Sequence, residues 1–275
     1  MKKRLFAVLA LLLASLLLFS ACDLKPAKPL RLELHGDGDE SMGIGRIKLH
    51  GGGETATKTL ALPEKFEHFS LEVAAGISFQ GPHSEADIVI DESLEERAVV
   101  LEADGNIAEF INLSLDEGIG RIKISTKRQA LLVGPAYIRI RIGAPVKNLA
   151  INGAWKVTYD CPSIKNCDIE INGTANSDFT FGTLKSLDLV INGAGACRLF
   201  GTAEEAEIEL NGAANVEAFD LVVQEATVEI NGAGSCEITA EKELEVDLNG
   251  VGRVTYAGDP ELDKEIHGIG TVRKR

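Results

Sequence analysis

The chain has 275 residues and a formal net charge of −14 at pH 7, with 42 Asp and Glu residues against 28 Lys and Arg residues. A surface with this excess of negative charge repels phosphate backbones, so we expect no nucleic acid partner. The length is ample for one continuous core in an architecture built from repeats.

Residues 1–21 have the order of a secretory signal. Lys2, Lys3 and Arg4 precede an apolar run over residues 5–19, and the small residues at 20–21 precede Cys22. This ending resembles a bacterial lipoprotein signal, in which the cysteine is acylated and becomes the mature N-terminus. The alternatives are an ordinary cleaved signal or an uncleaved anchor helix, but the apolar run is shorter than the ~20 residues that span a bilayer. We therefore predict a signal peptide at 1–21 and lipidation of Cys22.

Lipidation would anchor the exported chain to the bacterial cell membrane or the outer membrane. Cleavage before Cys22 removes three positive charges and no acidic ones, which changes the net charge from −14 to −17. Because anionic headgroups repel an acidic protein, we expect membrane contact through the N-terminal lipid alone. Residues 22–54 are predicted to comprise the lipidated cysteine, a proline-containing tether and irregular strands.

Residues 57–148 contain strand-like apolar runs without a fixed period. These runs are Phe69–Val73, Ile88–Ile90, Val99–Leu101, Ile119–Ile124 and Tyr137–Ile142.

From residue 151 onward an Ile-Asn-Gly or Leu-Asn-Gly phrase recurs. The steps between successive asparagines are 20, 20, 19, 20 and 18 residues, for Asn152, Asn172, Asn192, Asn211, Asn231 and Asn249. A fixed period of this size predicts stacked structural units. Apolar residues one and three positions before each asparagine alternate mostly with acids, which is typical of a strand with one buried face. Positions five and seven after the asparagine repeat the pattern, so each unit supplies two short strands.

Two architectures fit these units. If Asn-Gly forms a type I′ turn, each unit is a hairpin and the whole is an antiparallel meander. If Asn-Gly is a corner, each unit is one coil of a parallel β-helix and every residue stacks on its counterpart in the next coil. The β-helix is favoured because it accounts for identical residues at identical phase and for the small residue that follows each corner.

The repeated I-N-G-A-G and L-N-G phrases, together with ALPEKFEHFSLEVAAGISF at 61–79 and VKNLAINGA at 146–154, resemble the putative auto-transporter adhesin, head GIN domain family of bacteria. The resemblance covers residues 55–275 and implies an all-β, right-handed parallel β-helix with coils of about 18–20 residues. It also implies an exported protein, often a lipoprotein. This chain uses Asn where the family's corner usually contains serine.

The cysteines after Cys22 are even in number, which in an exported chain raises the question of disulfides. Cys197 and Cys236 share a repeat phase with Val216 between them, so they are predicted to lie two layers apart. That separation is roughly 10 Å, which is too far for a disulfide. Cys161 and Cys167 share one coil, and the sequence leaves open whether they form a disulfide or remain buried thiols.

Acidic residues are expected to form two columns on one outward face of the coils. One interpretation is a solvated face that keeps the β-rich surface soluble, and the other is a surface for divalent cations or a cationic partner. The solvated face is favoured, so we predict no cofactor, and a metal site only as the weaker alternative. The columns are Asp168, Asp188, Glu207 and Glu245 at one phase, and Glu170, Glu209, Glu229 and Asp247 at the next.

The sequence contains no nucleophile elbow, phosphate-binding glycine loop or zinc-spaced histidine pair, so we predict no catalytic residues and no enzymatic activity. The favoured function is a cell-envelope lipoprotein with an adhesin-like binding or scaffolding role toward a protein or glycan ligand. One alternative is a structural or sensing protein that faces the periplasm. A carbohydrate-active enzyme on a β-helix is the third. Such sites need convergent acids or a basic residue in a groove, generally with aromatic residues for sugar stacking, and the repeats have no clustered aromatic residues on an outward face.

Overall fold

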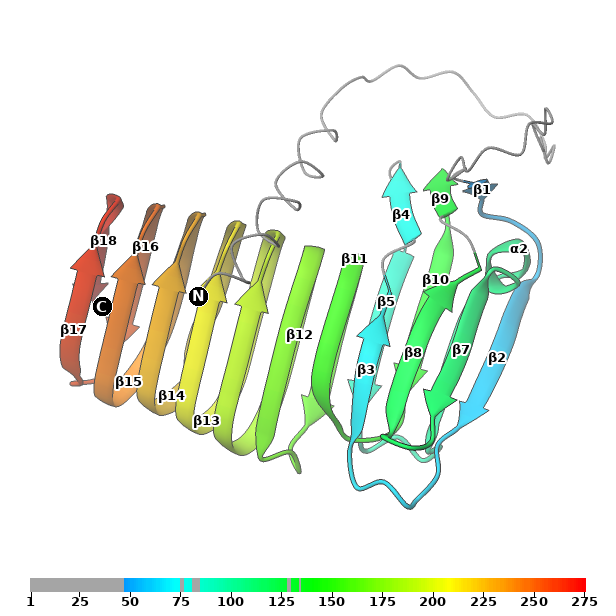
Figure 1. The fold of residues 1–275 in the computed structure, drawn as a ribbon, viewed down its shortest axis with the longest axis horizontal. Helices are drawn as coiled ribbons and strands as arrows, with labels where there is room; N and C mark the ends of the chain where they lie inside the picture. The colour runs from blue at the N-terminus through cyan, green and yellow to red at the C-terminus, as the bar shows by residue number, and fades with distance from the viewer. Residues whose placement is uncertain (1–46, 75–76, 81–84, 128–129, 134) are drawn as a thin grey trace. The chain divides into compact units, whose positions relative to one another are not determined.

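The computed structural model describes residues 47–74, 77–80, 85–127, 130–133 and 135–275 (Figure 1). Strands account for 75% of the structure and helix for 2%, and the strands form a solenoid of about 6 turns, which confirms the predicted all-β solenoid. No helix within the described ranges is long and apolar enough to cross a membrane. The predicted signal, Cys22 and the tether up to residue 46 lie outside these ranges.

The regular coils are built from long strands that follow the solenoid around its corners. Every pairing among these strands is parallel, with Asn152 opposite Asn172 and Gly153 opposite Gly173. The antiparallel meander is therefore excluded, while the right-handed sense of winding stays a prediction. The strands are β11 (Val146–Cys161), β12 (Asn166–Ile191), β13 (Ala194–Leu210), β14 (Ala213–Ile230), β15 (Ala233–Leu248), β16 (Val251–Ala257), β17 (Glu261–Ile266) and β18 (Ile269–Lys274).

The core lies inside the coils because alternate residues of each strand point inward. The apolar positions one and three residues before each asparagine are buried from the first coil to β15, as predicted. Larger rings fill the first coils, where Tyr159 lies between Phe179 and Phe181 at centroid distances of 5.6 and 5.4 Å. The Tyr159 hydroxyl donates a hydrogen bond to the carbonyl oxygen of Val146 at 2.7 Å, which satisfies the buried polar group.

Each Asn-Gly corner stacks on the corner of the preceding coil. The Asn192 side-chain amide donates to Asn172 Oδ1 at 2.9 Å, and the same bond recurs from Asn211 to Asn192 and from Asn231 to Asn211. A Cβ atom on Gly193 would lie 1.7 Å from the carbonyl oxygen of Gly173, so no other residue fits there. Close stacking is thus the main reason for glycine at the corners.

The strands before β11 are less regular and mix parallel and antiparallel pairs. β3 and β5 pair in parallel with β11 and extend the solenoid by one layer. β2 pairs antiparallel with β6, β6 with β10, and β7 with β8, while β1, β9 and β4 form a separate three-stranded parallel sheet. The bounds are β1 (Ile47–His50), β2 (Thr55–Ala61), β3 (Phe69–Val73), β4 (Ile77–Gln80), β5 (Glu85–Asp91), β6 (Ala98–Asp104), α2 (Gly105–Ala108), β7 (Ile111–Asp116), β8 (Arg121–Thr126), β9 (Ala130–Val133) and β10 (Tyr137–Ile142).

The predicted strand runs agree with these bounds except near residue 119. Phe69–Val73 and Tyr137–Ile142 match β3 and β10 in full, whereas the run predicted from Ile119 starts as a strand only at Arg121. Ile119 lies in the preceding turn and is 58% exposed, because Asp116 accepts hydrogen bonds from the Gly118 and Gly120 amides and closes the turn there. The antiparallel pairs also show that residues 55–145 are not coils of the regular type.

Candidate functional site

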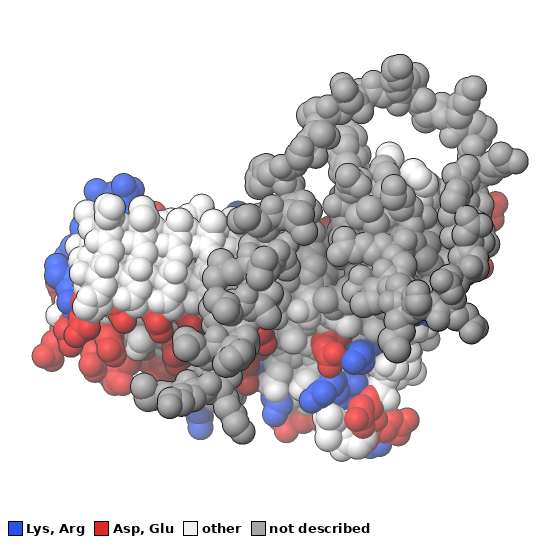
Figure 2. All heavy atoms as spheres, turned by 45° about the horizontal axis from the view of Figure 1, so that its top comes forward, with Lys and Arg blue, Asp and Glu red and all other residues white. Residues whose placement is uncertain are grey.

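The two predicted acidic columns lie on one outward face of the coils. Strand register places Asp188 opposite Glu207, and Glu209 opposite Glu229, which in turn lies opposite Asp247. Each column contains one residue that is not acidic: Thr227 lies between Glu207 and Glu245, and Val190 lies opposite Glu209. Figure 2 shows the Asp and Glu side chains gathered as a band along the regular coils.

A third acidic column lies two residues before the first one, and the sequence prediction missed it. Its members are exposed, and they continue the acidic face to the last coil. The sequence does contain this pattern, because these acids also recur at a single phase of the repeat. That phase lies two positions further from the asparagine than the phases that were compared. The column consists of Glu205, Glu225, Glu243 and Glu261, which are in direct register.

The column nearest the corner is tied to the asparagine ladder. Glu209 Oε1 accepts a hydrogen bond from the Asn211 amide at 2.7 Å, and Glu229 Oε1 accepts one from the Asn231 amide at 2.7 Å. These carboxylates therefore have protein partners that fix their position. The carboxylates of the other two columns, apart from Glu261, line an open hollow.

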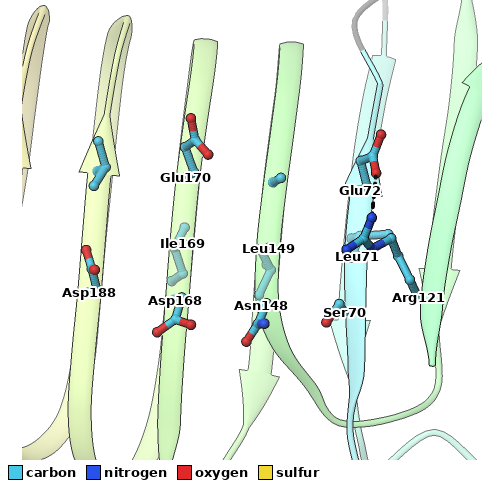
Figure 3. Close-up of a pocket in the computed structure, with 12 residues that line it drawn as sticks. Ser70, Leu71, Glu72, Arg121, Asn148, Leu149, Asp168, Ile169, Glu170 and Asp188 are labelled. Atoms are coloured by element: carbon cyan, nitrogen blue, oxygen red, sulfur yellow. Dashed lines mark ion pairs between the residues drawn. The ribbon is translucent and has the colours of Figure 1, made fainter. Parts of the chain in front are cut away.

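The acidic face is hollowed along two adjoining stretches that share Asp168 and Asp188. One hollow of about 450 Å³ crosses the coils over the outer acidic columns. The other, of about 470 Å³, extends toward β3 and β8 and includes Ser70 and Asn148. Figure 3 shows this second hollow, in which side chains from β3, β8, β11 and β12 lie along neighbouring strands. Together the hollows form one continuous open groove, here called the acidic groove.

Basic residues contact the acidic groove at its β8 end. Lys123 Nζ lies 3.0 Å from Glu72 Oε1, and Arg121 Nη1 lies 3.8 Å from Glu72 Oε2, as the dashed line in Figure 3 marks for one of these pairs. Partial burial raises the pKa of Asp188, and repulsion from Asp168 and Glu209 raises it further.

The carboxylates of the groove do not converge on one point. Register spreads them up the solenoid at the layer spacing of ~4.8 Å, with neighbours in successive coils. Within the part of the chain that the structure describes, no group of three or more His, Cys, Asp or Glu residues is placed to hold a metal ion. The arrangement suits an extended contact over several coils better than chelation of one ion.

The four cysteines of the described chain are buried thiols. Cys161 and Cys167 are both free, so the open question of a disulfide between them is answered by two reduced side chains near the Tyr159 hydroxyl. Cys197 and Cys236 each pair with Val216, which confirms their predicted separation by two layers. Burial raises the pKa of Cys161, Cys167 and Cys236 to about 12, so none of these is an activated nucleophile.

Solved structures of similar fold come from Bacteroides and Parabacteroides species, and a family model covers most of the solenoid. A putative adhesin from Bacteroides fragilis has a TM-score of 0.65 and 18% identity, over 82% of this chain and 100% of that one. A putative adhesin from Parabacteroides merdae has a TM-score of 0.50 and 19% identity, over 83% and 99%. A putative lipid binding protein from Parabacteroides distasonis has a TM-score of 0.50 and 17% identity, over 83% and 99%.

At these identities the likeness establishes the fold, and none of the curated proteins matches the chain in sequence. The family model is the stronger finding, because it spans residues 83–260 and so includes both the irregular strands and the regular coils. The chain belongs to the putative auto-transporter adhesin, head GIN domain family.

Proposed function

We propose that this protein is a non-catalytic lipoprotein of the bacterial cell envelope with an adhesin-like binding or scaffolding role. The observation that carries the proposal is the acidic groove, which stays open along consecutive coils and presents its side chains at a regular spacing. Such a surface fits an extended protein or glycan ligand rather than a small molecule, since small-molecule sites are concave and largely enclosed. Membership of an adhesin-named family supports an exported or surface position.

Lipidation of Cys22 is the part of the proposal that gives the solenoid its location. We expect the wild-type chain to incorporate a fatty acid analogue and the Cys22→Ala variant not to incorporate it. The matched control is Cys197→Ala, which removes a buried thiol and leaves the signal intact. Equal incorporation in the wild-type chain and in Cys22→Ala would contradict anchoring at this residue.

The position of the solenoid is tested by protease shaving of intact cells. We expect the wild-type protein to be cleaved while a periplasmic marker survives, which an adhesin requires. The alternative is a structural or sensing protein that faces the periplasm. Protection of the solenoid until the outer layer is breached would contradict the adhesin-like role and favour that alternative.

A further inference from the structure

At the end of the solenoid, the side formed by β16 and β18 differs in charge from the rest of this acidic molecule, including β17 of the same coil, which carries Glu261, Asp263 and Glu265. Residues 251–258 and 266–275, which include β16 and β18, contain no Asp or Glu and four basic residues. In Figure 2 the Lys and Arg side chains gather at this end of the regular coils, beside an uncharged face. The basic residues are Arg253, Arg273, Lys274 and Arg275.

Apolar side chains are exposed on the same end. Ile269 is 77% exposed and Val251 is 56% exposed, and Ile266 at the end of β17 is 41% exposed. Among the described residues only one other large apolar side chain is exposed to this degree, and it lies in the turn before β8. The β16 and β18 side of the last coils therefore combines exposed apolar surface with positive charge.

Strand register places these groups side by side on one outward face. Val251 lies opposite Ile269, and Arg253 lies opposite Thr271. Because alternate residues share a face, Arg273 points outward with Thr271, while Val272 packs against the core. Val251, Arg253, Ile269, Thr271 and Arg273 form what is here called the β18 patch.

The arginines of the β18 patch are not neutralised by the protein. Lys274 is paired with Asp259, but no ion pair among the described residues involves Arg253 or Arg273. This contrasts with Arg139, Arg141 and Arg198, each of which contacts a carboxylate. The two guanidinium groups are thus available to an external anion, and guanidinium binds phosphate with good geometry.

We propose that the β18 patch docks on a membrane surface that carries anionic phospholipid headgroups. Arginines next to exposed isoleucine and valine are the combination that interfacial membrane contacts use: the bases meet the phosphates and the apolar groups enter the boundary of the acyl chains. The acidic columns along the other face of the coils are repelled by the same headgroups. Docking therefore orients the solenoid with β18 toward the membrane and holds the acidic groove away from it.

The inference deepens the proposed lipid anchoring, which would keep the patch near a bilayer. Residues 22–46 can span up to about 80 Å when fully extended. The eleven strands that lie side by side from β2 to β18 extend about 50 Å at the spacing of ~4.8 Å, so a chain anchored at Cys22 can bring β18 to the membrane. The expectation of contact through the lipid alone followed from the net charge, which averages over two oppositely charged regions.

The test places one fluorescent probe on the β18 patch of the full chain. Thr271→Cys carries an environment-sensitive label, and Thr158→Cys is the matched control, because both threonines are exposed on outward positions at opposite ends of the regular coils. The four buried native cysteines are at most 1% exposed and are shielded from the reagent, and the labelled wild-type chain gives the background. Each protein is reconstituted in phosphatidylcholine vesicles with and without one third phosphatidylglycerol.

We expect a blue shift and quenching by lipid-attached quenchers at position 271 only when phosphatidylglycerol is present, and at position 158 in neither case. Arg253→Gln with Arg273→Gln should lower the ratio of docked to undocked protein about 25-fold, since each base near an anionic surface contributes about fivefold. Unchanged far-UV circular dichroism would show that this variant is folded. High salt should have the same effect as the substitutions.

Three results would overturn the proposal. One is identical emission at position 271 in both kinds of vesicle. Another is a shift at 271 and 158 alike, which would place the whole sheet on the membrane. The third is a shift in pure phosphatidylcholine that grows with protein density, which would assign the patch to a second copy of the chain. Flotation with phosphatidylcholine vesicles reports the acyl anchor separately, so loss of flotation with a retained shift at 271 contradicts lipidation and leaves docking standing.

Discussion

The glycine corners make a sharp prediction about stability, and Gly212→Ala tests it. A Cβ atom at position 212 would lie 1.9 Å from the carbonyl oxygen and 2.9 Å from the amide nitrogen of Gly193. Both neighbours are backbone atoms of the preceding coil, so no side chain can rotate away. The two coils must separate at this corner, and the Ala213 amide loses its 2.8 Å hydrogen bond to the Gly193 carbonyl.

The same separation lengthens the 2.9 Å bond between the Asn211 amide and Asn192 Oδ1. Two hydrogen bonds at about 1 kcal/mol each, with about 1–3 kcal/mol of overpacking strain, give a loss of about 3–5 kcal/mol in the free energy of unfolding. Urea unfolding followed by far-UV circular dichroism measures it as a lower midpoint at constant slope. Ala213→Ser is the matched control, because residue 213 is exposed at the same corner and should stay within about 0.5 kcal/mol of wild type. A Gly212→Ala variant as stable as that control would refute the close-stacking explanation.

Three further predictions concern the ladder, the acidic groove and the thiols. Asn231→Ala removes the bonds to Asn211 and from Asn249, at 3.0 and 3.1 Å, and should lower the free energy of unfolding by about 1–2 kcal/mol, whereas no loss in a urea titration would show that the ladder is energetically silent. Asp188→Asn should stabilise the protein at pH 7, because the pKa of this carboxyl is raised in the folded state and its ionised form therefore costs stability. That gain should vanish as the pH falls below about 4, where the carboxyl is protonated in both states, and a gain that persists in acid would contradict the charge explanation. Thiol reagents should leave the four buried cysteines unreacted in the folded protein and titrate all four after unfolding; a count of two would contradict the free thiols of the first coil.

The regular coils could be predicted from the sequence because each coil repeats the same local constraints. Asn192 and Asn211 occupy the same phase, and a position that must satisfy the same neighbours above and below tends to keep the same residue. Alternation of apolar and acidic residues before each asparagine then fixed which face is buried. Parallel stacking was favoured over hairpins for the same reason, since an antiparallel meander gives no reason for identical residues to stack on one another.

The strands before β11 could not be predicted to the same extent because their pairing produces no fixed repeat in the sequence. β7 (Ile111–Asp116) alternates as well as any strand of the coils, yet it pairs antiparallel with β8 and was not expected as a separate strand. A period of two residues identifies a strand with one buried face but not the direction of its partner. The turn after β7 depends on a hydrogen bond from the Gly118 amide to the Asp116 side chain, which a hydrophobic pattern does not record.

The net charge of the chain was predicted correctly, but the arrangement of charged residues on the surface was predicted only in part. The net value of −14 indicates an acidic molecule, but it does not locate the third acidic column or show that every charged residue of β16 and β18 is basic. In a solenoid each outward phase becomes a separate stripe, so the informative quantity is the charge of each phase in each coil. Counted in this way, Glu243 and Glu261 continue one acidic stripe. Arg273 interrupts the stripe of Glu217 and Glu237, and Arg253 lies in the adjacent stripe, which has no acid at Asn215 or Ser235. The interruption falls where apolar side chains are also exposed, and that coincidence singles out the end of the solenoid for contact with an anionic surface.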